Sequence, residues 1–143
     1  MPYLDTFDPD ATPSAEALVE AQKFRERAMT FHWIKEWNPQ TGLTDVQICN
    51  IRRVLAQGWP VCVGLRWPTR PKWKDDVLQM AEPDAVFDGH SVLFVGYQDD
   101  THLQGGGYFI YRNTNRPQSD ERMPYAYAKQ YANDAAYITS PLC

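Results

Sequence analysis

The sequence lacks the features that mark several classes of protein. Its 143 residues contain no run of lysine or arginine and its net charge is −4, so nothing indicates the basic surface of a nucleic-acid-binding protein. No apolar run approaches the length that crosses a bilayer, and the acidic N-terminus does not resemble a signal peptide. If Met1 is the true start, we expect a cytoplasmic protein that binds neither nucleic acid nor a membrane.

Cysteine is also scarce. Cys49, Cys62 and Cys143 are odd in number and have no tight spacing, which argues against a disulfide framework or a zinc site. The simplest interpretation is a reduced compartment and no metal or other cofactor, although a fragment of a secreted protein would look the same. Cys49 falls on a predicted helix far from any base in sequence, and we interpret it as a small hydrophobic residue rather than a nucleophile.

The residues that are present fit one globular domain. The sequence is 43% hydrophobic and 13% aromatic, and its length suffices for a real core. We expect helices over residues 13–27, 44–56 and 124–132, strands over residues 28–37, 60–65 and 135–139, a helical turn or irregular segment over residues 72–80, and a polar loop over residues 116–123. Thr12 is the expected cap of the first helix. This order predicts an α+β fold with an antiparallel sheet.

A predicted hairpin dominates the second half of the chain. Apolar residues 91–97 and aromatic residues 108–113 are separated by a polar loop with three consecutive glycines. Antiparallel pairing places Tyr97 opposite Tyr108 at the loop end and His90 near Asn113 at the open end. Directly opposed residues have Cβ atoms about 4.5–5.5 Å apart, so a histidine and an asparagine are expected side by side.

Such a pair has a known chemical use. The asparagine side-chain oxygen accepts a hydrogen bond from one ring nitrogen and fixes the tautomer, which leaves the imidazole able to act as a base or as the partner of a thiolate. The residues alone equally allow two unrelated polar side chains at a strand end. A third interpretation, in which His90 binds a metal with Asp88 and Asp84, lacks a second histidine nearby in sequence.

Four motifs resemble the C-terminal lobe of papain-like cysteine peptidases. GHSVLFVGY (residues 89–97) is similar to the family's G-H-A-V-L-x-V-G-Y strand, and YFIYRN (108–113) to its [YG]-F-I-x-[RK]-N strand. IRRVLAQGWPVCVG (51–64) and the closing MPYAY with residues 134–138 also resemble family segments, in the family's order. The resemblance implies an antiparallel sheet or partial barrel with flanking helices over residues 44–139, preceded by a lead-in over residues 1–43, in a single domain 1–143.

The resemblance also implies roles for individual residues. His90 matches the catalytic histidine and Asn113 the asparagine that orients it, while Gly64, Ser91 and Gly89 match positions bordering the substrate. The family's nucleophilic cysteine lies about 130–150 residues before this pair, which is beyond the start of this chain. The chain would therefore be a peptidase half or fragment, inactive alone, that requires the missing N-terminal lobe in trans or a homodimer to cleave a peptide or protein substrate.

Two departures from the family pattern lead to further expectations. Asn115 stands where the family has a tryptophan that shields the histidine–asparagine hydrogen bond, so His90 is expected in wetter surroundings. Loss of the partner lobe predicts an exposed apolar patch near His90, for which the five tryptophans and eight tyrosines offer material. These departures favour an alternative, a catalytically inactive papain-like module that binds a peptide or protein.

Overall fold

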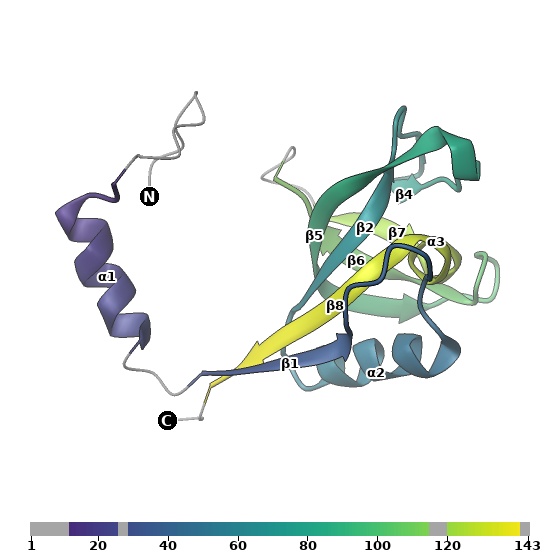
Figure 1. Cartoon of the computed structure of the whole chain (residues 1–143). Helices are drawn as coiled ribbons and strands as arrows, with labels where there is room; N and C mark the ends of the chain where they lie inside the picture. The colour runs from purple at the N-terminus through teal and green to yellow at the C-terminus, as the bar shows by residue number, and fades with distance from the viewer. Residues whose placement is uncertain (1–11, 26–28, 115–119, 141–143) are drawn as a thin grey trace. The chain divides into compact units, whose positions relative to one another are not determined.

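The computed structural model describes residues 12–25, 29–114 and 120–140, without the side chain of Asp88 (Figure 1). The chain divides into two compact units, residues 1–30 with 139–143, and residues 31–138. The first unit contains helix α1 (Ala15–Arg25), which confirms the helix predicted there. Its cap is Ser14 rather than Thr12, because the Ser14 hydroxyl accepts a hydrogen bond from the Ala17 N–H.

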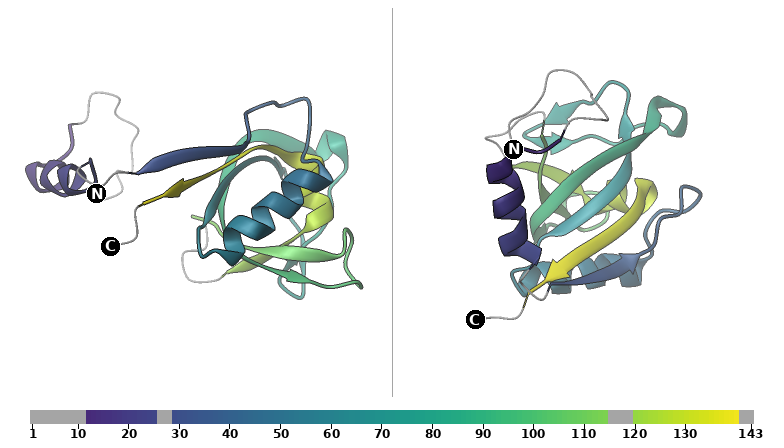
Figure 2. Two further views of the ribbon diagram at one scale, coloured as in Figure 1. Left: turned by 90° about the horizontal axis from the view of Figure 1, so that it is seen from below. Right: turned by 60° about the vertical axis from the view of Figure 1, so that its left-hand side comes forward.

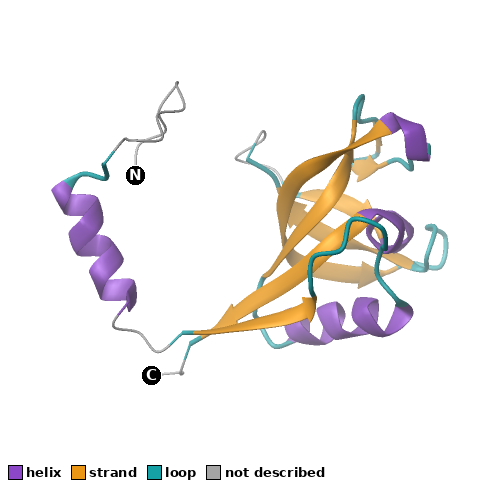
Figure 3. Cartoon of the chain, viewed as in Figure 1, coloured by secondary structure: helices purple, strands orange, loops and turns teal. Residues whose placement is uncertain are grey.

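The second unit is built on one eight-stranded sheet in the order β1-β8-β2-β5-β6-β7-β4-β3 (orange in Figure 3). Its strands are β1 (Thr30–Lys35), β2 (Val61–Pro68), β3 (Trp73–Lys74), β4 (Val77–Leu78), β5 (Val86–Asp99), β6 (Gly107–Arg112), β7 (Glu121–Pro124) and β8 (Ala132–Thr139). β2 pairs antiparallel with β5 and β8, as β6 does with β5 and β7, whereas β4 pairs parallel with β7. The predicted α+β class and antiparallel sheet are confirmed.

Helix α2 (Asp45–Ala56) begins and ends where its sequence predicts. The Thr44 hydroxyl accepts from the Gln47 N–H while the Gln47 side chain accepts from the Thr44 N–H, which completes a capping box. Gly58 follows the helix with φ of 85°, in the left-handed region that glycine tolerates. The buried face contains Ile48, Ile51, Val54 and Leu55. It packs against the sheet, whose strands curl around a common interior (Figure 2).

The segment expected as a helical turn or irregular structure over residues 72–80 is instead a hairpin. β3 and β4 pair antiparallel and are joined by Asp75 and Asp76 alone, with φ of 52° and 60°. Two consecutive left-handed residues make the turn type that matches the twist of a tight hairpin, and aspartate tolerates that conformation better than most side chains. The turn chemistry was visible in the sequence, but the strands are too short to give a periodic signal.

Other boundaries also differ from the predictions. β2 continues three residues beyond its predicted end, and β5 begins at Val86. Within the expected polar loop, residues 116–119 lie outside the described part, but Glu121–Pro124 form β7, which pairs with β6. Helix α3 (Tyr125–Tyr131) and β8 confirm the predicted last two elements, with β8 starting three residues earlier than expected.

The tyrosines lie mainly inside the second unit rather than on its surface. Tyr111, Tyr127 and Tyr131 are fully buried in the core with Phe94 and Phe109. The Tyr127 hydroxyl donates to the Arg66 carbonyl at 3.0 Å and that of Tyr131 to the Ala81 carbonyl at 2.6 Å. Buried phenols need such acceptors, and the expectation that tyrosines form an exposed patch is therefore wrong for these residues.

Candidate functional site

A bulge in β5 sets the direction of His90. Leu65 of β2 pairs with His90, and Trp67 pairs with Phe87. One residue of β2 therefore lies opposite two of β5, Asp88 and Gly89. Gly89 has φ of 94°, a conformation that costs glycine little and other residues more. We assign Gly89 the local role of permitting this bulge directly before His90.

His90 and Asn113 come together at the open end of the β5–β6 hairpin. Leu93 pairs with Arg112, which puts Asn113 opposite Val92 and diagonal to His90. The two side chains are hydrogen bonded, and Asn113 is buried. The predicted meeting is confirmed. At the loop end the register is one residue away from the prediction, since Tyr97 pairs with Phe109 after an irregularity between Phe94 and Gly96.

Trp67 covers the imidazole from the neighbouring strand. Its ring centroid lies 4.5 Å from that of His90 and 6.1 Å from that of Tyr111, and its side chain is buried. The Nε2 atom of His90 is buried and has no hydrogen-bond partner among the described residues. The expected effect of Asn115 on the His90–Asn113 hydrogen bond stays a prediction, because Asn115 lies outside the described residues.

The sequence contained a signal for Trp67 that our motif reading did not use. Val61, Val63, Leu65 and Trp67 alternate along β2, and all four are buried. Because side chains alternate between the faces of a strand, Trp67 belongs to the same inward row as Leu65, the partner of His90. A cover for the imidazole could have been found by extending this alternation two residues further.

Burial dominates the electrostatics of His90. Loss of hydration lowers its pKa below the ordinary value, and the hydrogen bond with Asn113 partly opposes that change. An imidazole with a lowered pKa is neutral at pH 7 and can accept a proton. This protonation state suits a base, but the Nε2 atom is buried, so a thiol can reach it only if the cover opens. The catalytic role of His90 stays a prediction.

The predicted substrate-bordering residues Gly64 and Ser91 are direct partners on β2 and β5. The Gly64 N–H donates to the Asp134 carboxylate of β8 at 3.1 Å, and a Cβ on Gly64 would collide with the same carboxylate. Gly64 is buried and Ser91 is exposed. Asp134, which the motif reading did not single out as a site residue, therefore occupies the space beside Gly64.

Cys62 is not placed to act as the nucleophile beside His90. Cys62 lies three residues before Leu65, the partner of His90, and so faces the other side of the sheet. Burial and the nearby Asp134 charge raise the pKa of its thiol, which opposes thiolate formation. Cys49 is exposed on α2 rather than buried as expected, and Cys143 lies outside the described residues.

The metal interpretation gains no support within the described part of the chain. No group of three histidine, cysteine, aspartate or glutamate side chains there could hold an ion. The side chain of Asp88, one of the proposed ligands, lies outside the described part. His102 is exposed in the loop between β5 and β6.

Comparisons with known proteins leave the chain without an assigned family. No protein-family model matches it, and no curated protein sequence matches it. None of the helices in the described ranges is both long and apolar enough to cross a membrane.

Proposed function

We propose that this chain is the C-terminal lobe of a papain-like cysteine peptidase and supplies the base for thiol-dependent hydrolysis of peptide bonds. The observation behind the proposal is the hydrogen-bonded His90–Asn113 pair beneath Trp67. The thiol comes from a partner lobe. The neutral imidazole takes its proton, the thiolate attacks the peptide carbonyl, and the imidazolium returns the proton to the leaving amine. Water then releases the acyl group, and Asn113 holds the ring throughout.

An exposed apolar surface favours association with a further chain. Leu93 of β5, Cys62 of β2 and Ala136 of β8 pair in one row across three strands. With Phe31 and Ile138 they line a shallow hollow of about 180 Å³, here called the outer patch. Phe31 is 54% exposed and Ile138 49%. Apolar surface of this kind favours association, as in a homodimer. The outer patch lies on the face of the sheet opposite His90, so it is not the patch expected near His90, and a lobe that supplies the thiol must approach from the other face.

The test is to restore the companion lobe, from the reading frame upstream of this chain or from a polypeptide that co-purifies with it, and to assay the complex on casein. We expect hydrolysis that iodoacetamide blocks and that His90→Ala reduces by about 10²–10⁴-fold, the usual contribution of a general base. His102→Ala is the matched control, because this histidine is exposed. A complex without activity, or one that His90→Ala leaves active, overturns the proposal.

The position of Cys62 favours a second candidate function. Its thiol faces the other side of the sheet from His90, which suits an inactive papain-like module that binds a peptide or protein. This alternative predicts saturable peptide binding by the lone chain. Binding that survives His90→Ala, combined with no hydrolysis in the restored complex, would select it over the peptidase.

A further inference from the structure

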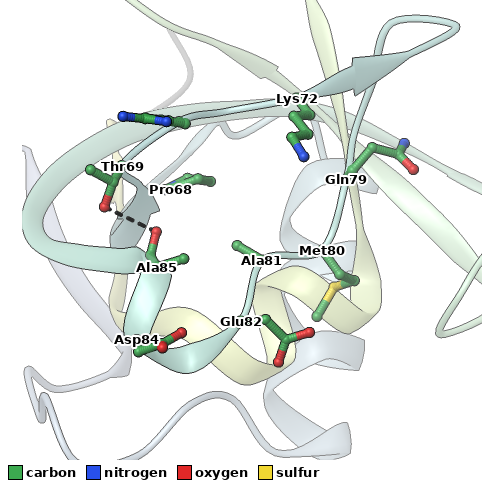
Figure 4. A pocket seen from close by; sticks show the side chains of 10 residues that line it. Pro68, Thr69, Lys72, Gln79, Met80, Ala81, Glu82, Asp84 and Ala85 are labelled. Atoms are coloured by element: carbon green, nitrogen blue, oxygen red, sulfur yellow. Dashed lines mark hydrogen bonds between the residues drawn. The ribbon is translucent and has the colours of Figure 1, made fainter.

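A second hollow lies beside the end of β2 and the start of β5 (Figure 4). Its volume is about 600 Å³. The lining includes the cations Arg70 and Lys72, the carboxylates Glu82 and Asp84, and the apolar side chains Pro68 and Met80. We call this hollow the charged pocket. Its volume falls within the range of pockets that take small ligands, about 300–1,000 Å³.

The opposite charges of the pocket stand on separate walls. Arg70 and Lys72 come from the segment between β2 and β3, whereas Glu82 and Asp84 come from the segment around the short helix η1 (Pro83–Ala85). Lys72 lies across the hollow from both carboxylates (Figure 4). Within the described ranges, none of the four side chains forms an ion pair with another. The two signs are thus kept apart and remain able to pair with a ligand.

The backbone holds the two walls at this separation. The Thr69 N–H donates to the Ala85 carbonyl at 2.8 Å, and the Thr69 hydroxyl donates to the same oxygen at 3.1 Å. On the other side, the Gln79 N–H donates to the Lys72 carbonyl at 2.9 Å. These bonds close the ring of chain around the pocket. A preformed site of this kind binds with little cost for ordering its walls.

The pocket is continuous with the strands that position His90. Pro68 pairs with Val86 at its edge, and Trp67 and Leu65 follow with their partners Phe87 and His90. The bulge at Asp88 and Gly89 shortens the path along β5. The partners of Val86 and His90 on β2, Pro68 and Leu65, are three residues apart, or about 10 Å at the rise of an extended strand. About three residues of an extended peptide span that distance.

We propose that the charged pocket binds a peptide segment with one basic side chain and one carboxylate, about three residues from the bond that lies at His90. Arg70 and Lys72 hold the carboxylate, and Glu82 and Asp84 hold the basic side chain. Met80 and Pro68 contact the aliphatic stems between them. The identity of the ligand as a peptide rests on the proposed function, whereas its charge pattern rests on the pocket.

The experiment is NMR titration of the ¹⁵N-labelled chain with the blocked tripeptide acetyl-Lys-Ala-Glu-amide and its neutral analogue acetyl-norleucine-Ala-Gln-amide. We expect saturable amide shift changes at the non-proline residues of the ranges 68–72 and 79–85. The neutral peptide should bind at least about tenfold more weakly. Lys72→Gln and Glu82→Gln should each lower the affinity for the charged peptide by about threefold or more. Lys74→Gln is the matched control, since this exposed lysine does not line the pocket. All three substitutions are at exposed positions, so the fold is kept.

Several results would overturn the proposed binding at the charged pocket. The proposal fails if the charged tripeptide does not bind, if both tripeptides bind equally, or if the shift changes fall outside the pocket. It also fails if Lys74→Gln loses as much affinity for the charged tripeptide as Lys72→Gln does. His90→Ala should leave the affinity unchanged. Binding at the pocket without hydrolysis in the restored complex refutes the peptidase proposal but not the pocket proposal. Hydrolysis without tripeptide binding refutes the pocket proposal but not the peptidase proposal.

Discussion

The two faces of the sheet formed by β8, β2 and β5 differ in which side chains are sheltered from water. On the inner face, His90 is hydrogen bonded to Asn113 and packed against the buried Trp67. On the outer face, Cys62 and Leu93 are exposed in one row with Ala136. The polar pair is thus sheltered while apolar side chains meet water, the reverse of the usual arrangement.

The two faces also differ in whether they depend on another chain. The inner face positions His90 with the chain's own residues, because Trp67, Asn113 and the Gly89 bulge all belong to it. The outer face contains surface that burial would stabilise by about 25 cal/mol per Å². A chain that covers the outer face therefore does not reach His90, and the nucleophile of the proposed peptidase would have to approach from the inner face.

Removing the inner cover should have the largest effect. Trp67→Ala deletes a buried ring that contacts both His90 and Tyr111, and such a change costs about 3–5 kcal/mol of unfolding free energy. Urea denaturation measures it. Trp37→Ala is the matched control, since Trp37 is 65% exposed, and it should change stability by about 0.5 kcal/mol or less. Equal losses in both variants would contradict the assigned burial of Trp67.

A smaller loss is expected at the boundary between β2 and β8. Gly64→Ala directs a methyl group into the Asp134 carboxylate, and overpacking of this kind costs about 1–3 kcal/mol. Thermal or urea unfolding of Gly64→Ala, Asp134→Ala and the double variant gives the coupling between the two residues. We expect the double variant to be more stable than the sum of the single losses. Strict additivity would show that the two side chains do not meet.

The pKa of His90 should move in opposite directions in two variants. Asn113→Ala removes the hydrogen bond that raises this pKa, so the pKa should fall further. Trp67→Leu admits water to the ring, so the pKa should rise toward its ordinary value. NMR titration of the His90 Cε1 proton measures the pKa in both variants, with Trp37→Leu as the control. A pKa that moves in the same direction in both variants would contradict the opposite effects assigned to burial and to the Asn113 hydrogen bond.

The same pKa predicts a pH dependence of stability. A histidine with a lowered folded-state pKa takes up its proton more readily when unfolded, so this contribution to stability is present above about pH 6.5 and is lost as the pH falls. The unfolding free energy should therefore decline from pH 7 to pH 5. His90→Gln should flatten that decline, and His102→Gln should not. An unchanged slope in His90→Gln would refute this origin.

The smallest predicted effect concerns the outer face. Burial and Asp134 raise the pKa of the Cys62 thiol, so Asp134→Asn should increase its alkylation by iodoacetamide at pH 8 by about two- to threefold. Mass spectrometry of the Cys62 peptide measures the rate, with the Cys49 peptide as an internal control. A decrease in the rate would mean that the Asp134 charge does not act on the thiol.

The sequence predicted elements wherever local chemistry and packing agree. The capping box at Thr44 and Gln47 located α2 to within a residue, and the hydrophobic pattern with the glycine loop located the β5–β6 hairpin. The same hairpin pattern brought His90 to Asn113, because antiparallel pairing leaves few alternatives at its open end.

The remaining features depend on contacts between segments distant in sequence. The role of Trp67 follows from pairing between β2 and β5, and that of Asp134 from pairing between β2 and β8. The charged pocket requires Lys72 and Glu82 to be set across a hollow by the β3–β4 hairpin. Two-residue strands give no periodic signal, so the hairpin and the pocket beside it could not be predicted.

The position of β1 at one end of the strand order has a consequence for handling the protein. A terminal strand presents backbone N–H and C=O groups that another chain can pair with. On β1 the side chains of Phe31 and Trp33 are about half exposed and pack edge to face. The strand's one lysine, Lys35, is buried and donates to the Asn38 and Asn133 carbonyls, so its charge cannot repel an incoming strand. We therefore expect concentrated samples to associate through this edge, and a charged substitution at Phe31 to oppose that association.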